Sequence, residues 1–185
     1  QKNEFGCLKP FYDTPLLNQI DRVRASLGLE TVSALDSADK YLPARHQLAV
    51  NNAALIYATG LCQFNAINRD EYDVVAVTGN SMGWYLALAC AGVVDFDAGA
   101  QLVNTMGGLM HEKGQGGQIV WSMADADWHI DPAKVAEVEV VLAEASRDGR
   151  AVHVSIRLGA MVVFAADDDG MKWLMERLPR MTDSR

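Results

Sequence analysis

The stretch DVVAVTGNSMGWYLALACAG, residues 73–92, contains the features that decide the fold. Its first part, Asp73 to Thr78, is a short run of β-branched and small apolar residues, which predicts a central strand covered on both faces. Gly79 ends this run. Met82 to Ala91 then has the composition of an apolar helix, which Gly92 closes. A strand that leads directly into a helix indicates an α/β fold.

The predicted junction carries Gly79-Asn80-Ser81-Met82-Gly83, a G-x-S-x-G pentapeptide. A sharp strand-to-helix turn holds such a serine in a strained backbone conformation and exposes its Oγ. Ser81 is therefore the candidate nucleophile, at a helix N-terminus that favours developing negative charge, and the Met82 N–H is the candidate oxyanion donor. We expect positions 79 and 83 both to require a residue as small as glycine, so that the neighbouring strand and helix can approach each other. The alternative is a tight turn whose serine only caps the helix.

The rest of the chain falls into two parts that differ in their predicted secondary structure. Helical spacing and capping residues predict helices over 15–27, 45–60, 95–113, 132–145 and 168–178, with an irregular segment over 31–45. Strands are predicted over 118–123, 151–156 and 161–166, the last two as a hairpin. The later β-α-β-β-α order matches a ferredoxin-like unit without its last strand. We therefore divide the chain into 1–115, an α/β core with the nucleophile elbow, and 116–180, a small α+β subdomain, with a glycine-rich hinge at 114–117.

Composition and charge exclude several classes of protein. The chain has 185 residues, of which 50% are hydrophobic and 22% charged, as in globular proteins. A net charge of −8 argues against a nucleic-acid partner, which requires clustered positive charge. No histidine pair has metal-ligand spacing, so we expect no metal. The three cysteines are odd in number and widely spaced, which argues against a disulfide framework: Cys7, Cys62 and Cys90.

The longest apolar stretch, residues 48–61, contains two asparagines and is shorter than the roughly 20 residues that a membrane span needs. No signal peptide opens the chain, so the sequence predicts a cytoplasmic protein without membrane association.

Val77 to Phe96 resembles the nucleophile region of malonyl-CoA:acyl carrier protein transacylases and of the acyltransferase domains of fatty acid and polyketide synthases. That family usually reads G-H-S-x-G-E-Y and then A-G-V-x-[DS]-[FL]. The match continues through residues 47–61, which resemble the T-Q-P-A helix of the family, through 100–103 and Met110, and through the strand 116–123. The resemblance implies an α/β-hydrolase-like acyltransferase core with a ferredoxin-like small subdomain, both incomplete in this chain.

The resemblance also implies a mechanism. Ser81 would attack the thioester of an acyl-CoA, form an acyl-serine, and pass the acyl group to the phosphopantetheine thiol of an acyl carrier protein. No cofactor is implied, because acyl-CoA is the substrate and the partner carries the phosphopantetheine. Two alternatives stay open: an acyl-thioester or ester hydrolase, and a non-catalytic module that binds carrier protein. Carrier proteins are usually acidic, so docking requires a basic patch, for which the candidates are Lys2, Lys9, Arg22 and Arg24, or Arg147, Arg150 and Arg157.

Two substitutions distinguish this chain from the family's site. The histidine before the serine is Asn80, which still donates and accepts hydrogen bonds. The arginine that pairs with the malonyl carboxylate is Met106, which cannot hold a carboxylate. Asn80 and Met106 are the candidate substrate-binding residues, and Met106 favours acyl groups without a second carboxylate. The alternative for Met106 is core packing.

Two parts of the family pattern are not matched. The family's general-base histidine follows the small subdomain, in a segment this chain lacks, and its N-terminal strand and G-Q-G-S-Q loop are also missing, with Gln1 as the candidate last residue of that loop. We therefore interpret the chain as the central part of a longer family member. Asn51 and Asn52 are expected to line the pocket or face solvent. The histidines are predicted to be ordinary surface or packed residues: His46, His111, His129 and His153.

Overall fold

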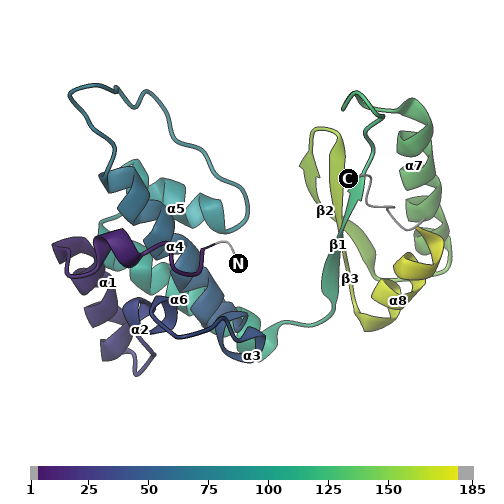
Figure 1. The fold of residues 1–185 in the computed structure, drawn as a ribbon. Helices are drawn as coiled ribbons and strands as arrows, with labels where there is room; N and C mark the ends of the chain where they lie inside the picture. Colours follow the sequence, from purple (N-terminus) through teal and green to yellow (C-terminus); the bar gives the residue numbers. More distant parts are fainter. Residues whose placement is uncertain (1–3, 179–185) are drawn as a thin grey trace. The chain divides into compact units, whose positions relative to one another are not determined.

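A computed structural model describes residues 4–178 of the chain. The chain forms two compact units, which divide between Gly114 and Gln115. Unit 1 is the part up to Gly114 and unit 2 is the part from Gln115 (Figure 1).

Unit 1 is helical in its described residues (Figure 1). A short 3-10 helix is followed by six α-helices: Lys9–Phe11, then α1 (Pro15–Ser26), α2 (Val32–Asp36), α3 (Pro43–His46), α4 (Ala49–Asn65), α5 (Met82–Cys90) and α6 (Phe96–Lys113). Side-chain caps explain where several begin. The Thr14 hydroxyl accepts a hydrogen bond from the Leu17 N–H at the start of α1, and the Asp95 carboxylate accepts one from the Ala98 N–H at the start of α6.

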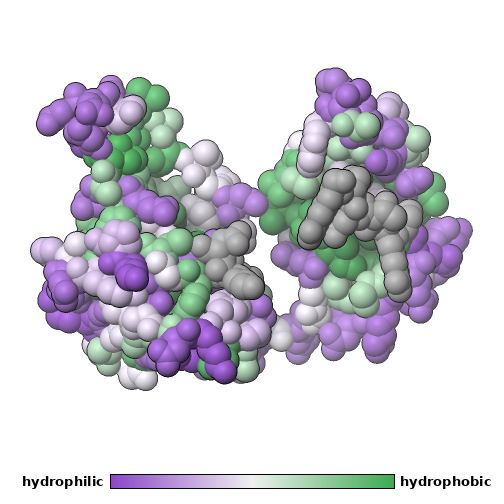
Figure 2. Space-filling model, in the orientation of Figure 1, coloured by the Kyte–Doolittle hydropathy of each residue, from purple (hydrophilic) through white to green (hydrophobic). Residues whose placement is uncertain are grey.

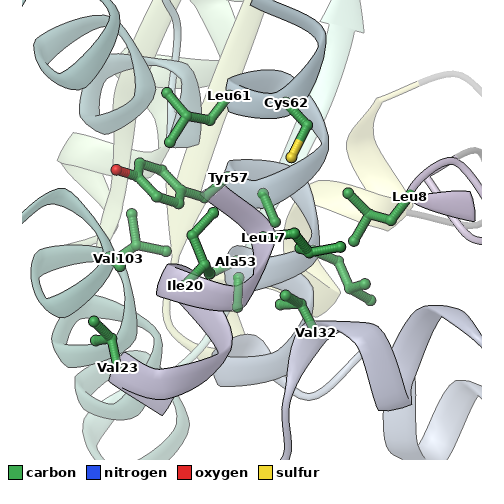
Figure 3. Close-up of a cluster of buried hydrophobic side chains, with 14 of the residues drawn as sticks. Leu8, Leu17, Ile20, Val23, Val32, Ala53, Tyr57, Leu61, Cys62 and Val103 are labelled. Carbon is green, nitrogen blue, oxygen red and sulfur yellow. The ribbon is translucent and has the colours of Figure 1, made fainter. Parts of the chain in front are cut away.

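The core of unit 1 forms where α1, α4 and α6 pack together. Leu17 and Ile20 of α1 contact this core, together with Tyr57 and Leu61 of α4 and Val103 of α6 (Figure 3). These side chains are almost completely buried, which shows that the apolar faces of the three helices pack against one another.

A glycine sets the spacing between α4 and α6. A Cβ on Gly107 of α6 would lie 2.7 Å from the Cα of Val50 in α4, so only a residue without a side chain allows this approach. The Tyr57 hydroxyl donates a 3.1 Å hydrogen bond to the Phe96 carbonyl at the other end of the pair. Since α6 meets the start of α4 with its later residues, the two helices run antiparallel.

Two sequence predictions for unit 1 are wrong. Residues 73–78 form neither a strand nor a helix, and Val75 is 89% exposed. Because Val75 is exposed, the segment between α4 and α5, residues 66–81, carries apolar surface beside its hydrophilic part (Figure 2). A buried parallel strand needs a neighbour on each edge, and residues 4–114 contain no strand to pair with it. The segment 31–45, expected to be irregular, instead holds α2 and α3, and the Thr31 hydroxyl caps α2 by accepting from the Ala34 N–H.

Unit 2 has the predicted β-α-β-β-α order (Figure 1). Its antiparallel sheet has the strand order β1-β3-β2, and α7 and α8 share one core with it. Trp121, Phe164 and Leu174 are central to that core. The Asp131 carboxylate caps α7 by accepting from the Ala133 N–H, and the Asp167 carboxylate caps α8 by accepting from the Gly170 N–H. The elements are β1 (Gly117–Ser122), α7 (Pro132–Arg147), β2 (Val152–Leu158), β3 (Met161–Ala166) and α8 (Asp168–Arg177).

Within residues 4–178, no helix is long and apolar enough to cross a membrane, and no group of three or more histidine, cysteine or acidic side chains is placed to hold a metal ion. The three cysteines in this part of the chain are free thiols, and Cys62 is the buried one.

Candidate active site at the turn before helix α5

The turn before α5 has the strained backbone that the pentapeptide predicts. Ser81 has φ 53° and ψ −121°, in the positive-φ region that non-glycine residues rarely adopt. Two turn hydrogen bonds hold it there: the Gly83 N–H donates to the Asn80 carbonyl at 2.8 Å, and the Trp84 N–H donates to the Ser81 carbonyl at 3.1 Å. Strain of this kind persists only where the surrounding structure fixes it, and it occurs preferentially at functional sites.

The two glycines of the pentapeptide have different roles. A Cβ on Gly79 would lie 1.9 Å from the Gly83 carbonyl oxygen and 2.7 Å from the Trp84 nitrogen, so the first turn of α5 requires glycine at position 79. A Cβ on Gly83 would meet no described atom within 4 Å. The expectation that Gly83 must also be small is therefore wrong for the described part of the protein, because no packed strand lies next to it.

Ser81 is exposed and its hydroxyl is available for chemistry. It occupies the N-cap position of α5, yet its side chain makes no capping hydrogen bond. No described residue accepts a hydrogen bond from the Met82 N–H, the first in the helix. An exposed hydroxyl beside a free N–H at the positive end of a nine-residue helix can support a negatively charged tetrahedral intermediate.

The two candidate substrate-binding residues occupy different environments. Asn80 is exposed in the turn itself, immediately before Ser81. Met106 is half-buried on α6, beside the glycine that packs against α4. Both candidates lie in unit 1, in which the helices α5 and α6 contact each other.

The segment before the turn borders an apolar hollow of about 400 Å³. Val77 and Thr78 line one side of it, and Phe64 of α4 and Leu86 of α5 line another. Side chains of α4, α5 and the segment before the turn therefore border the same apolar space.

The histidines are packed or exposed, as predicted. His46 is buried, its Nδ1 accepts a 3.0 Å hydrogen bond from the Leu42 N–H, and its Nε2 lies 3.0 Å from the Leu35 carbonyl. Its ring also stacks on Tyr41 at 4.9 Å. The other three histidines are exposed, and none of the four makes a hydrogen bond to Ser81 within residues 4–178: His46, His111, His129 and His153.

Arg24 does not belong to a surface patch. It is 0% exposed, and its guanidinium donates to the Val50 carbonyl and to the amide oxygens of Asn51 and Asn104. Burial lowers the pKa of Arg24 to about 10, which still leaves it charged at neutral pH. Asn51 likewise neither faces solvent nor lines the hollow. The sequence contained a signal for this, because Arg24 follows Ile20 at helical spacing on the apolar face of α1.

Of the other proposed basic residues, Lys9 of the 3-10 helix and Arg22 of α1 are exposed in unit 1, and the rest lie in unit 2 or outside the described residues. Arg150 is placed over the Trp173 ring at 5.3 Å, Arg147 lies 3.6 Å from the Asp148 carboxylate, and Arg157 is exposed on β2. Gln1 and Lys2, which the sequence assigned to a loop and to a patch, lie outside the described residues.

Comparison with known proteins places this geometry in a structural context. No family profile matches the chain, and no curated protein matches it in sequence. Solved structures do match. The malonyl-CoA:ACP transacylase of Synechocystis sp. PCC 6803 has a TM-score of 0.71 at 18% identity, over 96% of this chain and 55% of its own.

Two further structures extend the match. PlMCAT:AntF, a type II polyketide synthase acyl carrier protein in complex with its malonyl-transacylase, has a TM-score of 0.69 at 20% identity, over 96% of this chain and 56% of its own. The acyltransferase domain of ZmaA has a TM-score of 0.72 at 12% identity, over 96% of this chain and 40% of its own. The chain thus spans about half the length of these proteins or less. Over that span, it has the mixed α/β fold of malonyl-CoA:acyl carrier protein transacylases and polyketide synthase acyltransferase domains.

Proposed function

We propose that the protein is a serine acyltransferase of the transacylase type. The observation that carries the proposal is Ser81, an exposed serine at positive φ on a helix N-terminus, beside a free Met82 N–H. The fold shared with transacylases and acyltransferase domains supports the same assignment. Transfer of an acyl group is the reaction that the printed names of these neighbours have in common.

In the proposed reaction, the Ser81 Oγ attacks the carbonyl carbon of an acyl-CoA thioester. The hydroxyl proton leaves to a base, the carbonyl oxygen takes negative charge next to the Met82 N–H, and the carbon–sulfur bond then breaks to release CoA as its thiol. The acyl-serine ester is consumed in a second step, when the thiol of a phosphopantetheine attacks it. Ser81 is the nucleophile of the first step and the leaving group of the second, in which its Oγ regains a proton as the new carbon–sulfur bond forms, and Asn80 borders it as a substrate-binding residue.

The proposed acyl group has no second carboxylate. Met106 offers no positive charge to a malonyl carboxylate, and an unpaired carboxylate buried against a thioether is unfavourable. We therefore expect acetyl and longer acyl groups to label the protein in preference to malonyl.

The proposed acyl acceptor is an acyl carrier protein. One structural neighbour is a complex of such a carrier protein with its malonyl-transacylase, which supports this class of partner. With Arg24 buried, the remaining described basic candidates for docking are Lys9 and Arg22 in unit 1, and Arg147, Arg150 and Arg157 in unit 2.

One observation favours a second function, hydrolysis of acyl thioesters or esters. Ser81 is open to solvent in unit 1, and an acyl-serine that water reaches is hydrolysed before a thiol arrives. The two functions share the first step and differ in the second.

Intact-mass spectrometry separates these functions. The protein is incubated with acetyl-CoA and with malonyl-CoA, next to a Ser81→Ala variant. We expect an acyl adduct on the wild type that is absent from the variant, and more of it with acetyl-CoA. Free acid that forms without an adduct, and only when Ser81 is present, would identify a hydrolase. If neither an adduct nor free acid forms, both functions are wrong, and the non-catalytic carrier-binding module remains.

A further inference from the structure

A buried arginine joins helices α1, α4 and α6 close to Met106. Arg24 of α1 is 0% exposed, and its Nη1 donates to the Val50 carbonyl at 3.0 Å and to the Asn104 Oδ1 at 2.6 Å. Its Nη2 donates to the Asn51 Oδ1 at 2.7 Å. The guanidinium thus holds two adjacent residues of α4 and one residue of α6 at the same time, which its planar fork of donors allows.

Both asparagine side chains of this network are held at each end. The Asn104 Nδ2 donates to the Ala100 carbonyl at 2.8 Å, and the Asn51 Nδ2 donates to the Arg45 carbonyl at 2.9 Å. Each amide is therefore bonded through its oxygen and through its nitrogen, which fixes its orientation. Both asparagines are buried, and every contact of the network lies inside unit 1.

Met106 lies between two residues of α6 that are anchored on α4. Asn104 precedes it by two residues and accepts the hydrogen bond from Arg24. Gly107 follows it directly and lies against α4, where a Cβ would be 2.7 Å from the Val50 Cα. Val50 is also the residue whose carbonyl accepts from Arg24. The crossing of α4 and α6 therefore fixes the α6 backbone on both sides of Met106.

The Met106 side chain itself takes no part in the network. The helical rotation of about 100° per residue directs it about 60° to one side of the buried Val103, whereas Asn104 lies about 100° to the other side. Among the described residues, Met106 is not one of the partly buried side chains that pack against the core of unit 1. Core packing therefore does not account for position 106, and the contacts of Arg24 reach Met106 through the backbone of α6.

We propose that Arg24 is a positioning residue for substrate binding, which sets the place of Met106 by tying α6 to α4. This inference rests on the proposed function, in which Met106 is a substrate-binding residue. Lysine does not replace Arg24 in this role, because its ammonium group lacks the planar fork that reaches both helices. Loss of the network should weaken acyl-CoA binding and leave the turn around Ser81 intact, because local hydrogen bonds build that turn.

The test measures the rate of Ser81 acylation against acetyl-CoA concentration, by intact mass, on the full chain. For Arg24→Lys and for Asn104→Ala, we expect the half-saturating concentration to rise roughly tenfold, while the saturated rate of the folded molecules stays within about twofold. A merely structural role has a different signature. An unfolded fraction lowers the amount of adduct but does not change the half-saturating concentration of the molecules that remain folded.

Tyr57→Phe supplies the matched control. Tyr57 is also buried, and its hydroxyl also ties α4 to α6, through the 3.1 Å hydrogen bond to the Phe96 carbonyl. Phe96 lies about 15 Å from Met106 along the axis of α6. Tyr57→Phe should therefore lower stability and leave the half-saturating concentration unchanged.

The outcomes separate this inference from the function on which it rests. An unchanged half-saturating concentration in Arg24→Lys and Asn104→Ala would overturn the positioning role and leave Ser81 acylation intact. An equal rise in Tyr57→Phe would overturn it as well, because any loosening of the two helices would then suffice. If Arg24→Lys does not fold, Asn104→Ala alone decides between these results. If acetyl-CoA labels the wild type at no concentration, the proposed function is wrong and the positioning role falls with it.

Discussion

Replacement of Gly79 by alanine tests whether the turn geometry creates the nucleophile. The new Cβ would lie 1.9 Å from the Gly83 carbonyl oxygen, and real Cβ atoms essentially never approach below 3.0 Å, so the turn must open by about 1.1 Å. Overpacking of this kind destabilises by roughly 1–3 kcal/mol. Misplacement of a reacting group by about 1 Å lowers the rate roughly 100-fold. We therefore expect Gly79→Ala to acylate Ser81 about 100-fold more slowly.

Gly83→Ala is the matched control from the same pentapeptide. The space around a Cβ at position 83 is open among the described residues, and alanine favours a helix over glycine by about 1 kcal/mol. We expect this variant to label like the wild type and to melt at the same or a higher temperature. Initial rates of adduct formation, measured by quenched-flow mass spectrometry, give the comparison. Equal rates for wild type and Gly79→Ala, or equally slow acylation in both variants, would show that the turn geometry at Gly79 does not create the nucleophile.

Three further predictions concern unit 1 and are checked by thermal or denaturant unfolding. Gly107→Ala should lower the free energy of unfolding by roughly 1–3 kcal/mol, because α6 must move away from α4. Gly108→Ala should not, because a Cβ at that position meets no described atom within 4 Å. Equal effects of the two substitutions would contradict the close approach of α6 to α4. Asn104→Ala should cost about 1.5–3 kcal/mol because a buried guanidinium loses an acceptor, and the neighbouring Thr105→Ala, on an exposed position, should cost far less. Burial raises the pKa of the Cys62 thiol from 9.0 to about 11, so the folded state keeps the proton that the unfolded state releases, and stability should fall by about 2 kcal/mol as pH rises from about 9 to 11. Cys62→Ala should flatten that part of the pH profile, and an unchanged profile would rule out this contribution.

Local signals in the sequence are sufficient where the structure depends on near neighbours. Caps at Thr14, Asp95 and Asp131 mark helix starts that the structure contains, because a cap is an interaction within three residues. The hairpin of unit 2 is also local, and Gly159 turns it with φ 56°. The strain at Ser81 was predictable for the same reason.

Features that depend on distant partners were not predictable in the same way. The run Asp73 to Thr78 has the composition of a buried strand, but a strand exists only when other strands pair with it, and residues 4–114 provide none. Arg24 looked like surface charge because its acceptors, Val50, Asn51 and Asn104, come from helices far along the chain. The unequal roles of Gly79 and Gly83 likewise depend on which atoms surround each glycine in space.

Acyl transfer through Ser81 is tested most directly by following the fate of the acyl group that Ser81 carries. Wild-type protein is acylated with a radiolabelled acyl-CoA, freed of CoA, and chased either with buffer or with a holo acyl carrier protein, and the labelled peptide is mapped by mass spectrometry. We expect the label to reside on the peptide containing Ser81 and to move to the phosphopantetheine thiol faster than it is lost to water. A label on another residue, or one that the carrier protein does not accept, would contradict acyl transfer through Ser81.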